Sequence, residues 1–132
     1  KKETMSATIL IVDDEENARL NIGSFLSGRG YEIQTAATLA EARENLRLGN
    51  ADIILLDVEM PRMDGYEFAR HVRNNADTLN VPIIMVTSRV SEKHRARAIE
   101  IGVNDYLGKP YQERELMEAV QQQLASVWAA VR

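Results

Sequence analysis

Short runs of consecutive apolar residues recur along this chain, separated by longer stretches in which apolar residues return every three or four positions. The runs at residues 9–12, 53–56 and 83–86 contain no polar residue. A strand that is buried on both faces has this continuous apolar pattern, whereas a strand with one solvated face alternates polar and apolar residues. The runs therefore predict strands of a parallel sheet that is covered on both sides.

The whole pattern predicts five strands joined by helices. We expect the strands at residues 9–12, 31–35, 53–56, 83–86 and 105–108. Helical spacing is present in four sets of apolar residues: Ala18, Ile22, Phe25 and Leu26; Leu39, Ala42 and Leu46; Ala98 and Ile101; and Leu116, Val120, Leu124 and Val127. Such helices supply the long right-handed connections that parallel neighbours need. The expected fold class is α/β, with a doubly wound sheet.

Residues typical of helix ends support this interpretation. Thr38 with Glu41 has the pattern of a capping box, and Ser91 precedes a polar helical start. Three glycines stand where helices are expected to end: Gly30, Gly49 and Gly102.

Length and composition bound the remaining possibilities. At 132 residues the chain fits one domain, with a core at about residues 7–124 and with residues 1–6 and 125–132 as tails or linkers. The absence of cysteine excludes a disulfide framework and thiolate metal sites. No apolar run approaches the length of a membrane span, and a net charge of −4 gives no electrostatic footprint for nucleic acid. We expect a cytoplasmic protein without direct contacts to membrane or nucleic acid.

Polar residues follow several of the predicted strands at the point where each strand ends. They are Asp13, Asp14, Asp57, Thr87 and Lys109. In an open parallel sheet the carboxyl ends of the strands meet at one edge, and ligands bind there. We therefore expect these side chains to converge on a single site.

Clustered carboxylates repel one another unless a cation lies between them, and Mg²⁺ prefers oxygen ligands of this kind. With the metal in place, one carboxylate can attack phosphorus and form an acyl phosphate. Asp57 is the candidate nucleophile. Lys109 and the Thr87 hydroxyl would each bind a phosphoryl oxygen.

Four segments resemble two-component response-regulator receiver domains, and together they extend over nearly the whole chain. The segments are Ile-Val-Asp13-Asp14; Leu-Leu-Asp57-Val-Glu-Met60-Pro61-Arg-Met63-Asp64-Gly65; Val-Thr87-Ser88; and Tyr106-Leu-Gly-Lys109-Pro110. The resemblance implies a flavodoxin-like (βα)5 fold with five strands and five helices. It also implies that Asp57 accepts a phosphoryl group from the phosphohistidine of a histidine kinase.

The same resemblance implies a metal site and a switch. Mg²⁺ would be bound by Asp13, Asp14, Asp57 and the backbone carbonyl of Glu59. Thr87 would move toward the phosphoryl group and Tyr106 would change rotamer. These movements would remodel the face of the fourth helix, the fifth strand and the fifth helix, which a downstream protein or an attached output domain would contact. Such a domain is a phosphoacceptor switch rather than a turnover enzyme.

A narrower resemblance runs from residue 85 to residue 113. It is similar to the carboxyl-terminal receiver of chemotaxis-type hybrid histidine kinases, while residues 17–29 depart from that group. The host protein stays open between a response regulator and a hybrid kinase.

Three residues beside the expected site are candidates for tuning it. Ser88 is small enough to leave room for a phosphoryl group. Glu59 and Arg89 lie two residues beyond Asp57 and Thr87. We expect their side chains to meet across the entrance and to control hydrolysis through the access of water.

Other interpretations remain. Asp13 and Asp14 could simply cap a helix, and Tyr106 could be an ordinary core residue. A receiver-like module that acts without phosphorylation is one alternative function. A metal-dependent phosphohydrolase is another, although its usual second acid is only loosely matched by Glu59, and no substrate-cap segment is present.

Overall fold

Five strands and five helices alternate along the chain. The computed structural model describes residues 7–49, 51–59 and 65–130. The strands are β1 (Thr8–Val12), β2 (Glu32–Ala36), β3 (Ile53–Asp57), β4 (Ile83–Thr87) and β5 (Asp105–Gly108). The helices are α1 (Glu16–Ser27), α2 (Leu39–Arg47), α3 (Gly65–Arg73), α4 (Glu92–Ile101) and α5 (Glu113–Ala130). The predicted (βα)5 order is confirmed.

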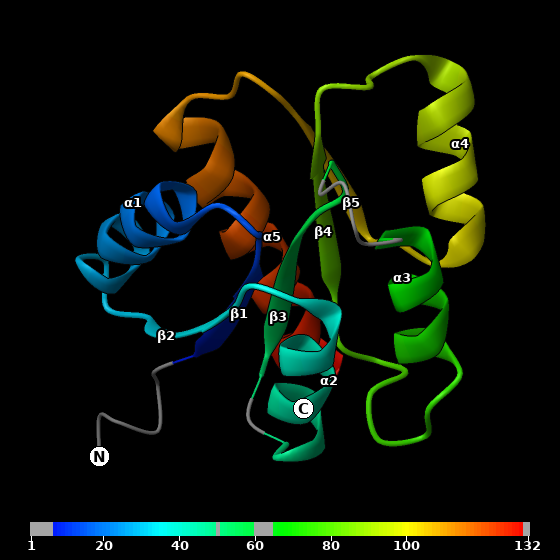
Figure 1. Cartoon of the computed structure of the whole chain (residues 1–132), viewed down its shortest axis with the longest axis horizontal. Helices are drawn as coiled ribbons and strands as arrows, with labels where there is room; N and C mark the ends of the chain where they lie inside the picture. Colours follow the sequence, from blue (N-terminus) through cyan, green and yellow to red (C-terminus); the bar gives the residue numbers. More distant parts are fainter. Residues whose placement is uncertain (1–6, 50, 60–64, 131–132) are drawn as a thin grey trace.

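The strands form one parallel sheet with the order β2-β1-β3-β4-β5. Helices α1 and α5 cover one face, and helices α2, α3 and α4 cover the other (Figure 1). The strand order reverses between β1 and β3, because the chain first builds outward to β2 and then returns to the other side of β1. This arrangement is the doubly wound flavodoxin-like topology, whose ligand crevice lies at that reversal.

The core consists of two apolar layers, one on each face of the sheet. Ile54, Leu56 and Phe68 belong to the layer under α2, α3 and α4. Ile53 and Leu55 belong to the layer under α1 and α5. Successive residues of β3 thus point to opposite faces, and all of them are buried. This double burial is the physical reason for the unbroken apolar runs.

Strand boundaries differ from the predicted ones by one residue at several ends. Strand β1 begins at Thr8, and β2 is displaced by one residue toward the carboxyl terminus. Strands β3 and β4 each extend by one residue, so that Asp57 and Thr87 are the last residues of their strands. Polarity does not end a strand when the backbone hydrogen bonds continue.

Helix ends follow the predicted pattern in part. The Thr38 hydroxyl accepts a hydrogen bond from the Glu41 amide at 3.1 Å, and Gly102 ends α4 in the left-handed region with φ of 115°. The Glu41 carboxylate accepts from the Ala37 amide, one residue before the cap. Helix α1 ends at Ser27 with Gly28 as its cap, so Gly30 lies in the following turn instead of at the helix end.

One half-buried cation, Arg73, joins α3 to the amino-terminal end of the sheet. The Arg73 guanidinium donates to the Gly102 and Val81 carbonyls, each at 2.8 Å, and to the Asn104 side chain. The same Asn104 oxygen accepts from the Ile83 amide at 2.9 Å. We call this group the Arg73 clamp, and it lies at the end of the sheet opposite to the polar strand ends.

Among the residues that the structure describes, no helix has the length and hydropathy needed to cross a membrane.

Candidate functional site

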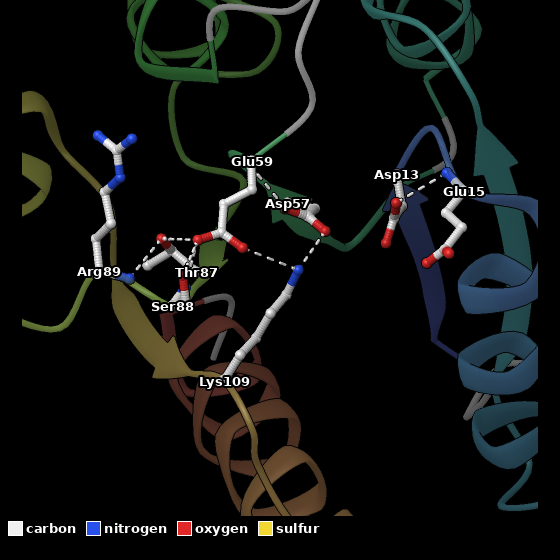
Figure 2. A network of polar contacts seen from close by, with 8 residues as sticks. All are labelled: Asp13, Glu15, Asp57, Glu59, Thr87, Ser88, Arg89 and Lys109. Atoms are coloured by element: carbon white, nitrogen blue, oxygen red, sulfur yellow. Dashed lines mark hydrogen bonds and ion pairs between the residues drawn. The ribbon is translucent and has the colours of Figure 1, made fainter.

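Four strand ends bring polar side chains together at the carboxyl edge of the sheet. Asp13 follows β1, Asp57 ends β3, Thr87 ends β4 and Lys109 follows β5. Figure 2 shows these side chains directed toward a common space above the strand ends, together with Glu59 and Ser88. The convergence predicted for these four residues is present in the structure.

Asp57 is held by two hydrogen bonds, one on each carboxylate oxygen. Its Oδ2 accepts from the Lys109 ammonium at 2.8 Å, and its Oδ1 accepts from the Glu59 backbone amide at 2.8 Å (Figure 2). The residue is 7% exposed. The carboxylate is therefore fixed in orientation while its edge faces the common space.

Lys109 bridges two carboxylates from different segments. Its Nζ lies 2.8 Å from Asp57 Oδ2 and 3.3 Å from Glu59 Oε1. Burial acts to lower the pKa of this ammonium, but the hydrogen bonds from Asp57 and Glu59 outweigh it and raise the pKa above its usual value. Lys109 is therefore a fixed positive charge. The Lys109–Pro110 peptide bond, whose isomer the sequence left open, is cis.

Asp13 is a buried carboxylate that makes no ion pair with another described residue. Burial, with a smaller contribution from the nearby Asp57 carboxylate, raises its pKa to about 6, against the lowering effect of the Glu15 amide that donates to Oδ1 at 3.0 Å. Asp14 is exposed, so the structure buries only one member of the expected acidic pair.

The donor set can be tested for its fit to a divalent cation. Within the described residues, no three carboxylate or imidazole groups are close enough to hold a metal by side chains alone. Mg²⁺ commonly uses one or two carboxylates and completes its shell with water, carbonyl and phosphate oxygens. The close, buried pair of Asp13 and Asp57 supplies two such carboxylates, and a bound cation would relieve the repulsion between them. The residues therefore fit a hard divalent ion.

The Glu59 carboxylate reaches into the same space from the loop after β3. Its Oε2 accepts from the Ser88 amide at 2.8 Å, from the Thr87 hydroxyl at 3.3 Å and from the Ser88 hydroxyl. Its Oε1 contacts Lys109. The hydrogen bond from the Ser88 hydroxyl, with smaller contributions from the Ser88 amide and Lys109, lowers the pKa of Glu59 to about 2. This side chain is an anion at neutral pH.

The expected approach of Glu59 to Arg89 is not present. The Arg89 guanidinium points away from the polar network in Figure 2, while the Glu59 carboxylate faces Thr87, Ser88 and Lys109. Four donor groups from three residues on the inner side, one of them a cation, outcompete one exposed arginine. Sequence position alone could not reveal this choice.

The segment after β4 connects the site to Tyr106. The Arg89 amide donates to the Thr87 hydroxyl at 3.0 Å, and the Arg89 carbonyl accepts from the Tyr106 hydroxyl. Tyr106 is buried, and the Arg95 guanidinium lies 5.5 Å from its ring centroid. The ring thus belongs to the core, while its hydroxyl is hydrogen-bonded to the segment that follows Thr87 and Ser88.

A cavity of about 210 Å³ extends from the polar edge toward α1 and α5. Its polar wall includes Asp13, Glu15, Asp57 and Lys109, and its apolar wall includes Tyr111. Glu15 and Tyr111 were absent from the sequence-based set of site residues. The Glu15 contact comes from its backbone amide, which no residue type reveals, and Tyr111 offers no signal beyond following the Lys109–Pro110 pair.

Comparison with known proteins agrees with this geometry. Residues 9–121 match the family model described as the response regulator receiver domain. The chain is 39% identical over 113 residues to the response regulator MprA of Mycobacterium ulcerans, with 86% of this chain and 48% of that protein covered. It is 34% identical over 113 residues to the transcriptional regulatory protein GltR of Pseudomonas aeruginosa, covering 86% of this chain and 47% of that protein. The chain spans about half the length of these curated relatives.

Solved structures show the same fold. The chemotaxis protein CheY4 of Vibrio cholerae superposes with a TM-score of 0.84 at 32% identity, covering 89% of this chain and 98% of that one. The signal receiver domain of a signal transduction histidine kinase from Syntrophus aciditrophicus gives a TM-score of 0.84 at 30% identity, with 92% of each chain covered.

Proposed function

The chain belongs to the response regulator receiver domain family of two-component signalling, and within it we propose that Asp57 is the residue that accepts the phosphoryl group. The observation that carries this proposal is the position of Asp57. Its carboxylate is buried at the end of β3, where a backbone amide orients it and an ammonium from another strand end pairs with it. A nucleophile held in this way needs little reorganisation before it reacts.

Phosphorylation is a displacement at phosphorus. An Asp57 carboxylate oxygen forms a bond to the phosphorus of a kinase phosphohistidine, the phosphorus–nitrogen bond breaks, and its electron pair returns to the imidazole. The product is an acyl phosphate on Asp57. In hydrolysis, water attacks the same phosphorus, and the Asp57 carboxylate leaves with inorganic phosphate as the other product.

Lys109 and Thr87 bind the transferred group. The Lys109 ammonium compensates charge on one phosphoryl oxygen, and the Thr87 hydroxyl donates to another. Both groups are already directed at an anion in the structure, since both contact the Glu59 carboxylate. Neither has to exchange a proton for this role.

Receiver domains typically bind Mg²⁺ at an acidic pocket, and here Asp13, the exposed Asp14, Asp57 and the Glu59 carbonyl would hold it. When bound, the ion neutralises the repulsion between the carboxylates and the incoming phosphoryl group. The buried, unpaired charge of Asp13 supports this assignment.

Output would pass through Thr87 and Tyr106. A shift of Thr87 toward the phosphoryl group moves the Arg89 backbone, which is the hydrogen-bond partner of Tyr106. Tyr106 lies on β5 against α4, so the change reaches the surface made of α4, β5 and α5. A downstream protein or an attached output domain would contact this surface, with a histidine kinase as the phosphodonor.

The phosphohydrolase alternative requires a protonated acid two residues after the nucleophile. Glu59 holds that position, but its lowered pKa and its contact with Lys109 leave it without the proton that a general acid must supply. This favours a switch that assists its own modification over a phosphohydrolase.

The direct experiment is incubation with Mg²⁺ and acetyl phosphate followed by intact-mass measurement. We expect one phosphoryl adduct that is abolished by EDTA and by Asp57→Asn. Asp77→Asn is the matched control, because Asp77 is an exposed carboxylate on the loop before β4 and should leave the adduct unchanged. An adduct that persists in Asp57→Asn would exclude Asp57 as the acceptor, and its absence in the wild type would favour a module that acts without phosphorylation.

A further inference from the structure

The donors that would bind the phosphoryl group are already occupied by a side chain of the protein. One Glu59 oxygen contacts the Lys109 ammonium, and the other accepts from Thr87 and from Ser88 (Figure 2). These donors come from the ends of two different strands, β4 and β5. They therefore form a binding site for an anion, and a carboxylate fills it.

We propose that the Glu59 carboxylate competes with the phosphoryl group for the Lys109 and Thr87 donors. When Asp57 is phosphorylated, the Glu59 side chain must leave these donors. This inference rests on the function proposed above. A carboxylate and a phosphoryl group both present negatively charged oxygens, and Lys109 and Thr87 cannot give the same hydrogen bonds to both. Occupancy by one excludes the other.

The competitor is tethered beside the reaction centre. The Glu59 amide donates to Asp57 Oδ1 at 2.8 Å, so the side chain starts two residues from the acceptor and has a high effective concentration at the donors. An incoming phosphoryl group has to outcompete an intramolecular ligand. The apparent affinity for any phosphoryl-like anion is lowered by the fraction of molecules in which the donors are already taken.

The structure also provides a place for the displaced side chain. The Glu59 side chain is 29% exposed, whereas Thr87 beneath it is fully buried. A hollow of about 330 Å³ opens beside it, with Tyr66 and Arg89 among its lining residues. Glu59 can rotate into this hollow, toward the Arg89 guanidinium, without any movement of the core.

The test uses Glu59→Gln, which removes the charge and keeps the backbone carbonyl that would bind the metal. With Mg²⁺ present, we expect a rate of adduct formation from acetyl phosphate, and an affinity for beryllofluoride measured by calorimetry, that are each about tenfold higher than in the wild type. A tenfold change corresponds to donors that are occupied in about nine-tenths of the unphosphorylated molecules. Glu92→Gln removes the same charge from an exposed residue at the start of α4 and should change neither quantity by more than about twofold.

A crystal structure of the wild-type protein with Mg²⁺ and beryllofluoride gives a second test that needs no variant. We expect the Glu59 carboxylate to have left Thr87 and Ser88 for the hollow beside Arg89. Unchanged kinetics and affinity in Glu59→Gln, or a Glu59 carboxylate that still contacts Thr87 in the complex, would overturn the inference while an Asp57-dependent adduct keeps the proposed function intact. Absence of that adduct in the wild type would overturn both.

Discussion

Asp13 and Asp57 are two buried carboxylates at one edge of the sheet, and Lys109 contacts only the second of them among the described residues. Burying a charge is costly unless an opposite charge or several hydrogen bonds compensate it. Asp13 has one backbone amide for this purpose and a carboxylate neighbour that acts against it. Electrostatic strain in the metal-free protein is therefore concentrated at Asp13.

At this scale we predict that Asp13→Asn stabilises the metal-free protein by about 1 kcal/mol, because the amide is neutral and can still accept from Glu15. The measurement is urea denaturation with EDTA present. Mg²⁺ should raise the unfolding free energy of the wild type by linkage and have a much smaller effect on the variant. Asp77→Asn is the control, and a loss of stability in Asp13→Asn would contradict the proposed strain.

A second prediction concerns the only ammonium at the described strand ends. Lys109→Met should lower the rate of adduct formation by about a hundredfold, since it removes a preorganised charge from the phosphoryl oxygens. Lys93→Met removes an ammonium from the exposed surface of α4 and serves as the control. The assay is the time course of intact mass with acetyl phosphate. A similar rate in Lys109→Met and Lys93→Met would show that Lys109 has no part in phosphoryl binding.

Among the elements, α3 is fixed to the sheet by apolar contacts and by the Arg73 clamp. Phe68, Ala69 and Val72 are buried against the sheet, and the clamp joins the end of α3 to the segments that precede β4 and β5. Burial lowers the pKa of Arg73, yet its hydrogen bonds to carbonyl and amide oxygens keep the guanidinium satisfied. The clamp thus adds side-chain hydrogen bonds beside the backbone hydrogen bond from Asn104 to Ile83, where the two strands begin.

We predict that Arg73→Met lowers the unfolding free energy by about 2–3 kcal/mol, because the Gly102 and Val81 carbonyls lose a charged donor. Arg70→Met, one turn away on the same helix, should change it by less than about 0.5 kcal/mol, since Arg70 is an exposed partner of Glu67 at 3.6 Å. Chemical denaturation of both variants measures the difference. Equal effects would mean that the clamp adds nothing beyond a surface ion pair.

For the whole molecule, the central strands make the two apolar layers interdependent. Neighbouring residues of β3 point into opposite layers, as Ile53 and Ile54 do. If the helices on one face of the sheet unfolded, the strands would lose half of their packing, and the layer on the other face would lose its support. The molecule should therefore unfold as one cooperative unit.

The corresponding prediction pairs one substitution from each layer. Phe68→Ala should cost about 3–5 kcal/mol and Leu116→Ala about 2–5 kcal/mol, each from a fully packed position. Both should keep a single transition, with circular dichroism and tyrosine fluorescence coinciding in urea. Leu20→Ala, at a residue that is 61% exposed, is the control. Transitions that separate in either core variant would show that the layers unfold independently.

The topology and the site were accessible from the sequence to different degrees. Continuous apolar runs predicted the strands, because burial on both faces leaves no room for polar alternation. The positions of Asp57, Thr87 and Lys109 followed from where those runs end. The destination of the Glu59 side chain did not, because it depends on Ser88 and Lys109, which lie far away in the chain and meet it only after folding.

Segments without an apolar signature were the least predictable. Helix α3 was expected only from the family resemblance. Arg73 at its end forms the clamp, and two of the three groups that Arg73 contacts are backbone carbonyls, which no residue type reveals. Residues 60–64, which belong to the Asp57 segment of the family resemblance, lie outside the described residues. Strand ends were displaced by single residues. There the backbone hydrogen bonds of the strand continue into a polar residue, as at Asp57 and Thr87.

The Arg73 clamp and the proposed phosphoryl site lie at opposite ends of the same strands. Substitutions at such separated positions contribute to stability nearly independently. A lineage can therefore accumulate or lose stability at the amino-terminal end while it adjusts signalling lifetime at the carboxyl-terminal end. The sheet thus separates residues that stabilise the fold from residues that set the chemistry of the site. A substitution that destabilises the site can be compensated by a stabilising substitution near the Arg73 clamp.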